Sequence, residues 1–199
     1  MAEGGHERES GGSPAPRGES PARSTGLSKA ELDREFERLY RDHLRDVYSF
    51  AYYRVGDHHD AEDLTEQAFL QAYRHFDRAL AESGGRPLRP WLIRIVANLA
   101  ANYYRDRSRR PQAALDAVAP PAAPHGTDRI VEGREELGAI VELIRELPDD
   151  RREALIMRFA LGMDNREIAR AMGRSDGATK VLLHRSVKQL EEMLGERGL

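Results

Sequence analysis

The sequence predicts an all-α protein made of two small helical domains. Apolar residues recur at three- and four-residue steps after residue 27, as they do on one face of an α-helix. The stretch before residue 110 shows no strand-like alternation of apolar and polar residues. Residues 110–128 are rich in Pro and Ala, which is typical of an extended linker. We therefore expect a tail at 1–27, an N-terminal domain at 28–109, a linker at 110–128 and a C-terminal domain at 129–199.

Composition excludes several classes of protein. The 199 residues are 40% hydrophobic and 33% charged, a mixture typical of globular domains, and the net charge of −3 gives no general indication of nucleic-acid binding. Cysteine is absent, which excludes disulfides and Cys-based metal sites. The sequence contains no apolar run near the roughly 20 residues that span a bilayer and no secretory signal core, so we expect no membrane insertion and a cytoplasmic location. Residues 1–26, rich in Gly, Ser, Pro, Glu and Arg, predict disorder.

Three helices are predicted in the N-terminal domain. Ser28 and Glu31 have the spacing of a capping box, and Gly56 with Asp57 ends the first helix. A second helix is expected from Asp60, followed by a loop at 83–87 and a third helix at 89–107. The apolar faces comprise Phe36, Leu39, Tyr40, His43, Leu44, Val47 and Phe50 in the first helix, Leu64, Ala68, Phe69, Ala72, Tyr73 and Phe76 in the second, and Trp91, Leu92, Ile95, Val96 and Leu99 in the third. This pattern predicts a bundle with short connections.

The C-terminal domain is predicted to contain four helices. The first carries Ile130, Leu137, Ile140, Val141, Ile144 and Leu147 and ends at Pro148. The second covers about 150–160, with Ala154, Leu155, Met157 and Phe159 on its apolar face. The third covers 165–172, with a capping box of Asp164 and Glu167, and the last extends from a cap at Ser175 to about residue 194.

Residues 165–185 have the pattern of a helix-turn-helix. Ala169 is small where two helices cross closely, and Gly173 lies in the turn, where a positive φ favours glycine. The residues expected to pack the two helices together are Ile168, Thr179, Leu182 and Leu183. The outer face of the second helix is expected to comprise Ser175, Asp176, Lys180, Val181 and His184. In this motif that helix enters the major groove, where Lys180, Arg185 and Lys188 can contact phosphates and Lys180 or His184 can reach bases.

The N-terminal domain changes the sign of its charge along the chain. Residues 31–82 hold 13 acidic and 7 basic side chains, whereas residues 86–110 hold seven Arg and one Asp. The basic segment also carries Trp91, Asn98, Asn102, Tyr103 and Tyr104. Arginines with aromatic and amide side chains suit single-stranded DNA, because cations follow the backbone, rings stack on bases and amides read base edges. Trp91 is expected to belong to the core instead.

Three motifs, in this order, resemble the extracytoplasmic-function (ECF) sigma factors. Residues 60–74, DAEDLTEQAFLQAYR, resemble the polymerase-binding helix of that family. Residues 90–106, PWLIRIVANLAANYYRD, resemble the helix that melts and reads the −10 element. Residues 147–159, LPDDRREALIMRF, with the helix-turn-helix that follows, resemble the domain that reads the −35 element. The resemblance covers about residues 36–194 and implies a sigma factor that recruits RNA polymerase to promoters, with no enzymatic activity and no cofactor or metal of its own.

The resemblance also implies roles for individual residues. At the β′ clamp helices of core polymerase it places Asp60, Asp63, Leu64, Glu66, Gln67 and Phe69, whose acidic character fits a basic partner. Near the −10 DNA it places Arg86, Arg89, Arg94, Asn98, Asn102 and Arg105, around a pocket that captures an unstacked base. At the −35 duplex it places Arg174, Ser175, Lys180, Val181, His184, Arg185 and Lys188. The implied partners are core polymerase, through its β′ and β subunits, promoter DNA and an anti-sigma factor.

One segment departs from the family pattern. The family commonly has Gly-Thr-Val-Lys-Ser-Arg-Leu on the reading helix, where this chain has GATKVLL at 177–183. Val181 and Leu182 replace a Ser and an Arg, which predicts the loss of polar DNA contacts. Val181 can instead contact a thymine methyl group. We therefore expect an altered −35 preference or weaker DNA binding by this domain.

Other classes of protein compete with this interpretation. A stand-alone helix-turn-helix transcriptional regulator would bind duplex DNA without polymerase. An enzyme would need a phosphate-binding loop, a nucleophile with its base, or a cluster of metal ligands, and no such pattern is recognised. His58, His59 and Asp60 come nearest to a ligand set, but adjacent residues point in different directions from a helix. An adaptor or anti-sigma protein would leave the charge reversal and the helix-turn-helix unexplained.

Overall fold

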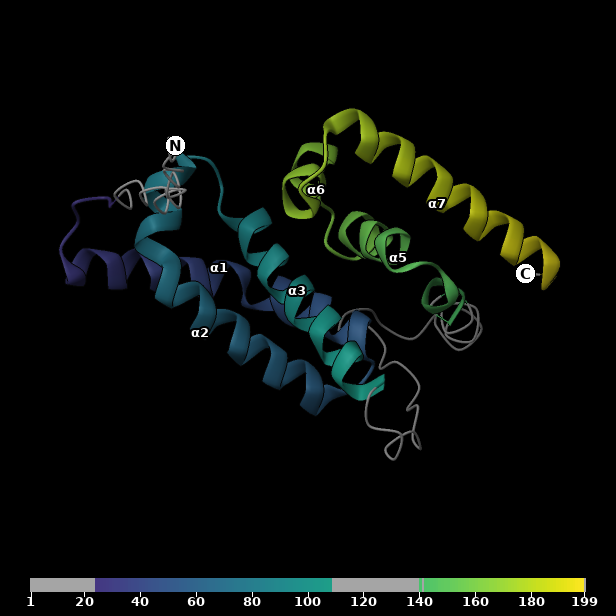
Figure 1. Ribbon diagram of the computed structural model, residues 1–199, viewed down its shortest axis with the longest axis horizontal. Coiled ribbons are helices and arrows are strands. Elements are labelled where there is room, and N and C mark those ends of the chain that lie inside the picture. The colour runs from purple at the N-terminus through teal and green to yellow at the C-terminus, as the bar shows by residue number, and fades with distance from the viewer. Residues whose placement is uncertain (1–23, 109–139, 141, 199) are drawn as a thin grey trace, which may run out of the picture.

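The computed structural model describes residues 24–108, 140 and 142–198, and all regular secondary structure within them is helical (Figure 1). The elements are α1 (Lys29–Val55), α2 (His58–Ser83), α3 (Arg89–Ser108), α5 (Asp149–Leu155), the π-helix η1 (Ile156–Ala160), α6 (Asn165–Met172) and α7 (Asp176–Glu196). Residues 142–146 are also helical. The all-helical prediction is thereby confirmed. Residues 1–23 of the predicted tail, the linker at 110–128 and the apolar positions Ile130, Leu137 and Val141 lie outside the described residues.

Local capping sets the ends of α1 and α2. The Ser28 hydroxyl accepts the N–H of Glu31, and the Glu31 carboxylate accepts the N–H of Ser28 at 2.8 Å, so the predicted capping box is present. Gly56 ends α1 with φ of 77°. The Asp57 side chain then accepts the N–H of Asp60 at 3.0 Å. As a result α2 begins at His58, two residues before the predicted start.

The predicted helix at 150–160 changes form halfway along. The α-helical part ends at Leu155, and a π-helical turn follows in which the N–H of Leu161 bonds the carbonyl of Ile156 at 3.2 Å. A π-turn holds an extra residue, which rotates the following side chains away from the original face. Phe159, predicted on the apolar face, is consequently 68% exposed, so that prediction was wrong.

The helix-turn-helix forms as predicted. Asp164 and Glu167 complete a capping box at the start of α6, and Gly173 ends that helix with φ of 65°. Ala169, expected where the two helices cross closely, is buried. The four side chains expected to pack the two helices together are all buried, namely Ile168, Thr179, Leu182 and Leu183.

The left-handed conformation of Gly173 leads to a matched pair of stability predictions. Gly173→Ala is expected to lower the free energy of unfolding by about 1 kcal/mol or more, because a Cβ is disfavoured at positive φ. The added methyl group would also lie 3.0 Å from Nη2 of Arg94. Gly177→Ala, inside α7 with open space around it, should instead stabilise the chain by up to about 1 kcal/mol. Urea denaturation of both variants checks this, and equal shifts would contradict it.

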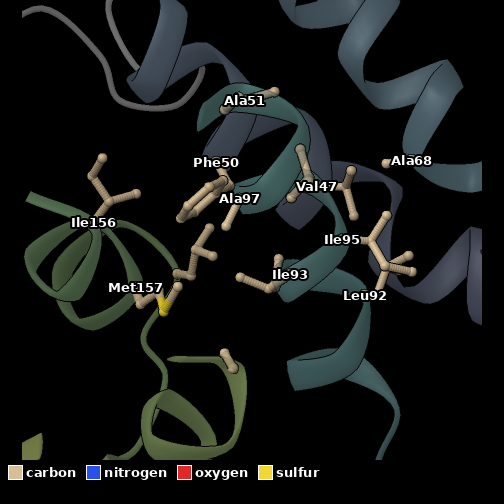
Figure 2. Packing of buried hydrophobic residues seen from close by; sticks show 14 of the residues in the cluster. Val47, Phe50, Ala51, Ala68, Leu92, Ile93, Ile95, Ala97, Ile156 and Met157 are labelled. Carbon is tan, nitrogen blue, oxygen red and sulfur yellow. The ribbon is translucent and has the colours of Figure 1, made fainter. Parts of the chain in front are cut away.

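The N-terminal helices α1–α3 and the C-terminal elements α5–α7 share one continuous apolar cluster. Figure 2 shows Phe50 of α1 and Ile93 and Ala97 of α3 facing Ile156 and Met157 of η1. In Figure 1, α6 lies beside α3, while α7 lies on the far side of α6 and α5. The C-terminal domain is therefore packed against α3 and the end of α1. Among the described helices, none has an apolar stretch sufficient to cross a bilayer.

Candidate functional site

A groove of about 870 Å³ lies between α1 and α2 on the surface of the N-terminal domain. Aromatic rings form its floor. The ring centroids of Phe36 and Tyr73 lie 5.0 Å apart in an edge-to-face arrangement, and those of Tyr40 and Phe69 lie 4.6 Å apart. Charged side chains at its border comprise Arg41, Arg45, Glu62 and Glu66. An apolar floor with a charged rim is the usual construction of a protein-binding surface.

The six residues predicted to bind polymerase differ in where they lie relative to this groove. Glu66 and Phe69 line it. Asp63 and Gln67 are exposed, and the three- and four-residue steps from Asp63 to Glu66, Gln67 and Leu70 place them along its edge. Leu64, by contrast, is buried in the bundle, where it cannot contact another protein.

Asp60 has an internal contact, because its carboxylate accepts a hydrogen bond from the Tyr103 hydroxyl of α3.

The prediction missed the contribution of α1 to the groove. Tyr40 and Leu44 were assigned to the core face, yet they are 40% and 37% exposed and line the groove. Phe36, Tyr40, Leu44 and Tyr48 follow one another at four-residue steps along α1, and all four line the groove.

The exposed surface of α3 carries most of the residues predicted near the −10 DNA. Arg94, Asn98, Asn102 and Arg105 are all exposed along this helix, and the Arg105 guanidinium donates to the Asn102 side-chain oxygen. At the start of α3 lies a second hollow, of about 400 Å³. Its polar and aromatic lining includes His75, Arg78, Arg86, Trp91, Arg94 and Arg170. Trp91 is half-buried, with part of its ring against the core and part in this hollow.

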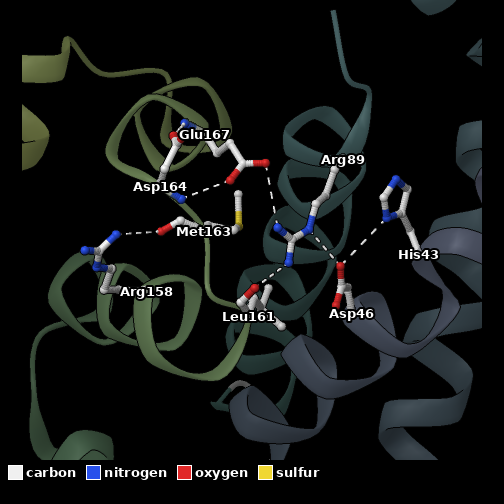
Figure 3. A network of polar contacts seen from close by, with 8 residues as sticks. All are labelled: His43, Asp46, Arg89, Arg158, Leu161, Met163, Asp164 and Glu167. Atoms are coloured by element: carbon white, nitrogen blue, oxygen red, sulfur yellow. Dashed lines mark hydrogen bonds and ion pairs between the residues drawn. The ribbon is translucent and has the colours of Figure 1, made fainter.

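Arg89 is separated from the other predicted −10 residues. Its side chain is only 17% exposed, and its Nε donates to Asp46 of α1 at 2.7 Å. The same guanidinium donates to the backbone carbonyl of Leu161 and lies 3.7 Å from the Glu167 carboxylate, both in the C-terminal domain (Figure 3). In this structure Arg89 joins the two domains.

Ionic and hydrogen-bond partners hold the pKa of Asp46 below its usual value, although burial acts in the opposite direction. His43 and Arg89 supply the stabilising contacts. Asp46 therefore remains a carboxylate that fixes Arg89 from the N-terminal side.

The residues predicted to read the −35 duplex lie on α7 as far as Lys188 and at the two positions before this helix. They are all exposed, namely Arg174, Ser175, Lys180, Val181, His184, Arg185 and Lys188. Arg174 forms an ion pair with Asp150 at 3.1 Å. Leu182 is buried against α6, so of the two apolar replacements only Val181 lies on the reading surface. Burial of Leu182 agrees with its expected role in packing the motif, and the loss of polar DNA contacts at these two positions stays a prediction.

The histidine-rich turn does not form a ligand set. The His58 ring stacks on Tyr52 and bonds the Tyr48 hydroxyl, whereas His59 is 94% exposed and lies 3.9 Å from Glu62. The described part of the chain contains no cluster of three or more His, Cys, Asp or Glu side chains suited to a metal ion.

Comparison with known proteins agrees with this arrangement. Residues 39–110 match the family described as Sigma-70 region 2, and residues 137–190 match the family described as Sigma-70, region 4. Helices α1–α3 thus correspond to region 2, and α5–α7 to region 4, of a sigma-70-type protein. Within that class, the chain belongs to the ECF RNA polymerase sigma factors.

Two relatives and one solved structure show the extent of the similarity. The ECF RNA polymerase sigma factor BldN of Streptomyces coelicolor is 34% identical over 163 residues, which cover 80% of this chain and 60% of BldN. The RNA polymerase sigma factor CarQ of Myxococcus xanthus is 33% identical, with coverage of 82% and 91%. The sigma factor RpoE from Bartonella quintana, solved with the anti-sigma factor NepR, has a TM-score of 0.64 at 25% identity, with coverage of 81% and 98%. This chain thus spans 60% of the length of BldN, less than two thirds, but nearly all of CarQ.

Proposed function

We propose that this chain recruits core RNA polymerase to specific promoters and starts transcription there. The observation that carries the proposal is the order of two surfaces on one chain of this family. An apolar groove comes first, bordered by acidic residues of α2 and by Arg41 and Arg45 of α1, and an exposed helix, α7, follows. A binding surface for protein and a separate one for DNA are what a promoter-directing subunit needs.

The groove and its acidic edge are proposed to bind the β′ clamp helices of core polymerase. Phe69 and Glu66 lie within it, and Asp63 and Gln67 lie along its border. Leu64 supports the same helix from inside the core. Acidic side chains at the rim favour a basic partner and speed encounter with it.

Promoter DNA is proposed to meet the chain at two places. The exposed positions Arg94, Asn98, Asn102 and Arg105 of α3, with Arg86 and the hollow beside Trp91, suit the melted −10 strand. The start of α7, with Lys180 and His184, suits the −35 major groove. The Pro- and Ala-rich residues 110–128 would connect these two sites as a semi-stiff spacer.

An anti-sigma factor is a further proposed partner. The sigma factor RpoE, whose fold this chain shares at 25% identity, was solved as a complex with the anti-sigma factor NepR. The groove offers exposed apolar area that such a partner can cover.

Transcription in vitro tests the proposed function. Core polymerase from the source organism is given a pool of its genomic fragments, with and without this chain. Discrete new start sites that need the chain are expected, and they would also reveal the promoter sequence. Binding of duplex DNA without any association with core would instead support a stand-alone regulator.

A further inference from the structure

The first turn of α7 carries an acidic side chain beside the residues predicted to contact the −35 duplex. Asp176 is the first residue of this helix, and its side chain is 60% exposed. Four-residue steps from Asp176 lead to Lys180, His184 and Lys188, all of them exposed. Residues four positions apart lie on the same face of a helix. An ionised carboxylate only accepts hydrogen bonds and a lysine only donates them, so this row begins with an acceptor and continues with donors.

The contacts of Asp176 within the chain leave its carboxylate exposed to a partner. Its Oδ2 atom lies 3.8 Å from Nε of Arg166 on α6, and the Arg166 side chain is itself 80% exposed. Ion pairs this exposed contribute little stability, because both groups stay hydrated and salt screens them. Ser175, and not Asp176, caps the helix, since the Ser175 hydroxyl accepts the N–H of Ala178 at 3.2 Å. Neither the cap of α7 nor a strong ion pair accounts for Asp176.

The helix dipole offers a structural explanation for an acid at this position. Carboxylates in the first turn of a helix are stabilised by the dipole, which would raise the stability of α7 slightly. On a surface that approaches DNA the same charge has a cost, because phosphates repel it. A purely structural role changes the stability of the fold and has no effect on which base is preferred. Base preference therefore separates the two explanations.

The chemistry of the major groove specifies which base an exposed carboxylate suits. Residues near the N-terminus of a reading helix contact base edges. Cytosine presents the N4 amino group there, which can donate to a carboxylate. Guanine presents the acceptors N7 and O6, and thymine presents the acceptor O4 with a methyl group. A carboxylate held against these acceptors would lose water without gaining a hydrogen bond, which disfavours both bases.

We infer that Asp176 is a specificity-determining residue that selects a cytosine in the −35 element. The N4 amino group of this cytosine donates to the Asp176 carboxylate, and the same charge rejects guanine and thymine. The preference falls at the single base pair that the first turn of α7 reads. Lys180, one turn further along, then lies over the neighbouring part of the site. The inference rests on the proposed function, because it requires α7 to enter the major groove.

Selection of duplexes from a randomised pool tests the assignment. The full-length chain, alone and with core polymerase, is used to capture duplexes, which are then sequenced. The parent chain should enrich a motif with cytosine at one position, preferred by roughly 5- to 150-fold over guanine or thymine, as for one good base contact. Asp176→Ala should lose the preference at that position and keep the rest of the motif. Asp176→Asn should change the preference from cytosine to adenine, since an amide pairs with N6 and N7 of adenine.

A matched control separates a base contact from a general effect of charge. Glu191→Gln makes the same change from carboxylate to amide at an exposed position further along α7, and should retain the cytosine. Equal helical content by circular dichroism confirms that the variants fold. An unchanged motif in both Asp176 variants, or an equal change in the control, would overturn the assignment and leave the proposed function intact. If the parent chain enriches no motif, with or without core, the proposed function fails and the assignment fails with it.

Discussion

Replacing Asp63 by arginine should abolish detectable binding to core polymerase while the fold stays intact. Asp63 is exposed on α2 beside the apolar groove, so its substitution disturbs no core packing. If a basic surface of polymerase approaches this edge, the variant sets like charges against each other. Like-charge juxtaposition at an interface costs several kcal/mol, which predicts binding weaker by roughly 100-fold or more.

Co-migration with core polymerase on size exclusion, followed by titration with a labelled chain, measures this effect. Glu191→Arg is the matched control, because it makes the same change of charge at an exposed position on α7. It should bind core normally. Normal core affinity of Asp63→Arg would remove α2 from the proposed interface, and equal weakening in both variants would indicate a general effect of net charge.

The features that the sequence predicted well are those set by near neighbours. Capping at Ser28 and Asp164 and the turn at Gly173 depend on residues within four positions, and the structure shows each of them. The exposure of Lys180 and His184 also followed from helical periodicity. Local hydrogen bonding and a 3.6-residue repeat are sufficient to predict these features.

The features that the sequence did not predict depend on distant partners. Arg54 was one of several basic residues in an acidic segment, and its ion-pair partners, Asp149 and Glu153, lie in the other domain. In the sequence, Arg89 does not differ from the other arginines of the basic segment. Its contacts with the Leu161 carbonyl and the Glu167 carboxylate of the other domain distinguish it in the structure. Periodicity reports which face of a helix is apolar, and it contains no information on which other segment covers that face.

The groove and the π-turn show a further limit of periodicity. The wide apolar stripe on α1 contains two kinds of residue. Val47 and Phe50 are buried in the core, whereas Tyr40 and Leu44 are exposed in the groove. The apolar stripe alone does not show which of its residues are buried, because burial depends on how much of the stripe the neighbouring helices cover. Phe159 was displaced by one extra residue in the turn of η1, which no local repeat reveals.

Lys180→Glu is expected to weaken promoter binding and to spare binding of core polymerase. Lys180 is exposed on the fifth residue of α7, beside Val181, where the motif approaches the major groove. Val181 offers only apolar contact, so we expect Lys180 and His184 to make the polar contacts with DNA at this point. Loss of such a contact costs about 1–3 kcal/mol, or roughly 5- to 150-fold in affinity, and a reversed charge adds repulsion from phosphates.

The salt dependence of binding then separates the two roles open to Lys180. If it meets a phosphate, affinity should fall equally on all sequences, and the slope of log affinity against log salt should decrease by about 1. If it reads a base, the loss should be concentrated on the cognate −35 sequence. Lys29→Glu, at the first residue of α1, carries the same change of charge and should leave promoter binding unchanged. Equal losses in the two variants would contradict a specific role for α7, and promoter recognition would then depend mainly on the surface of α3.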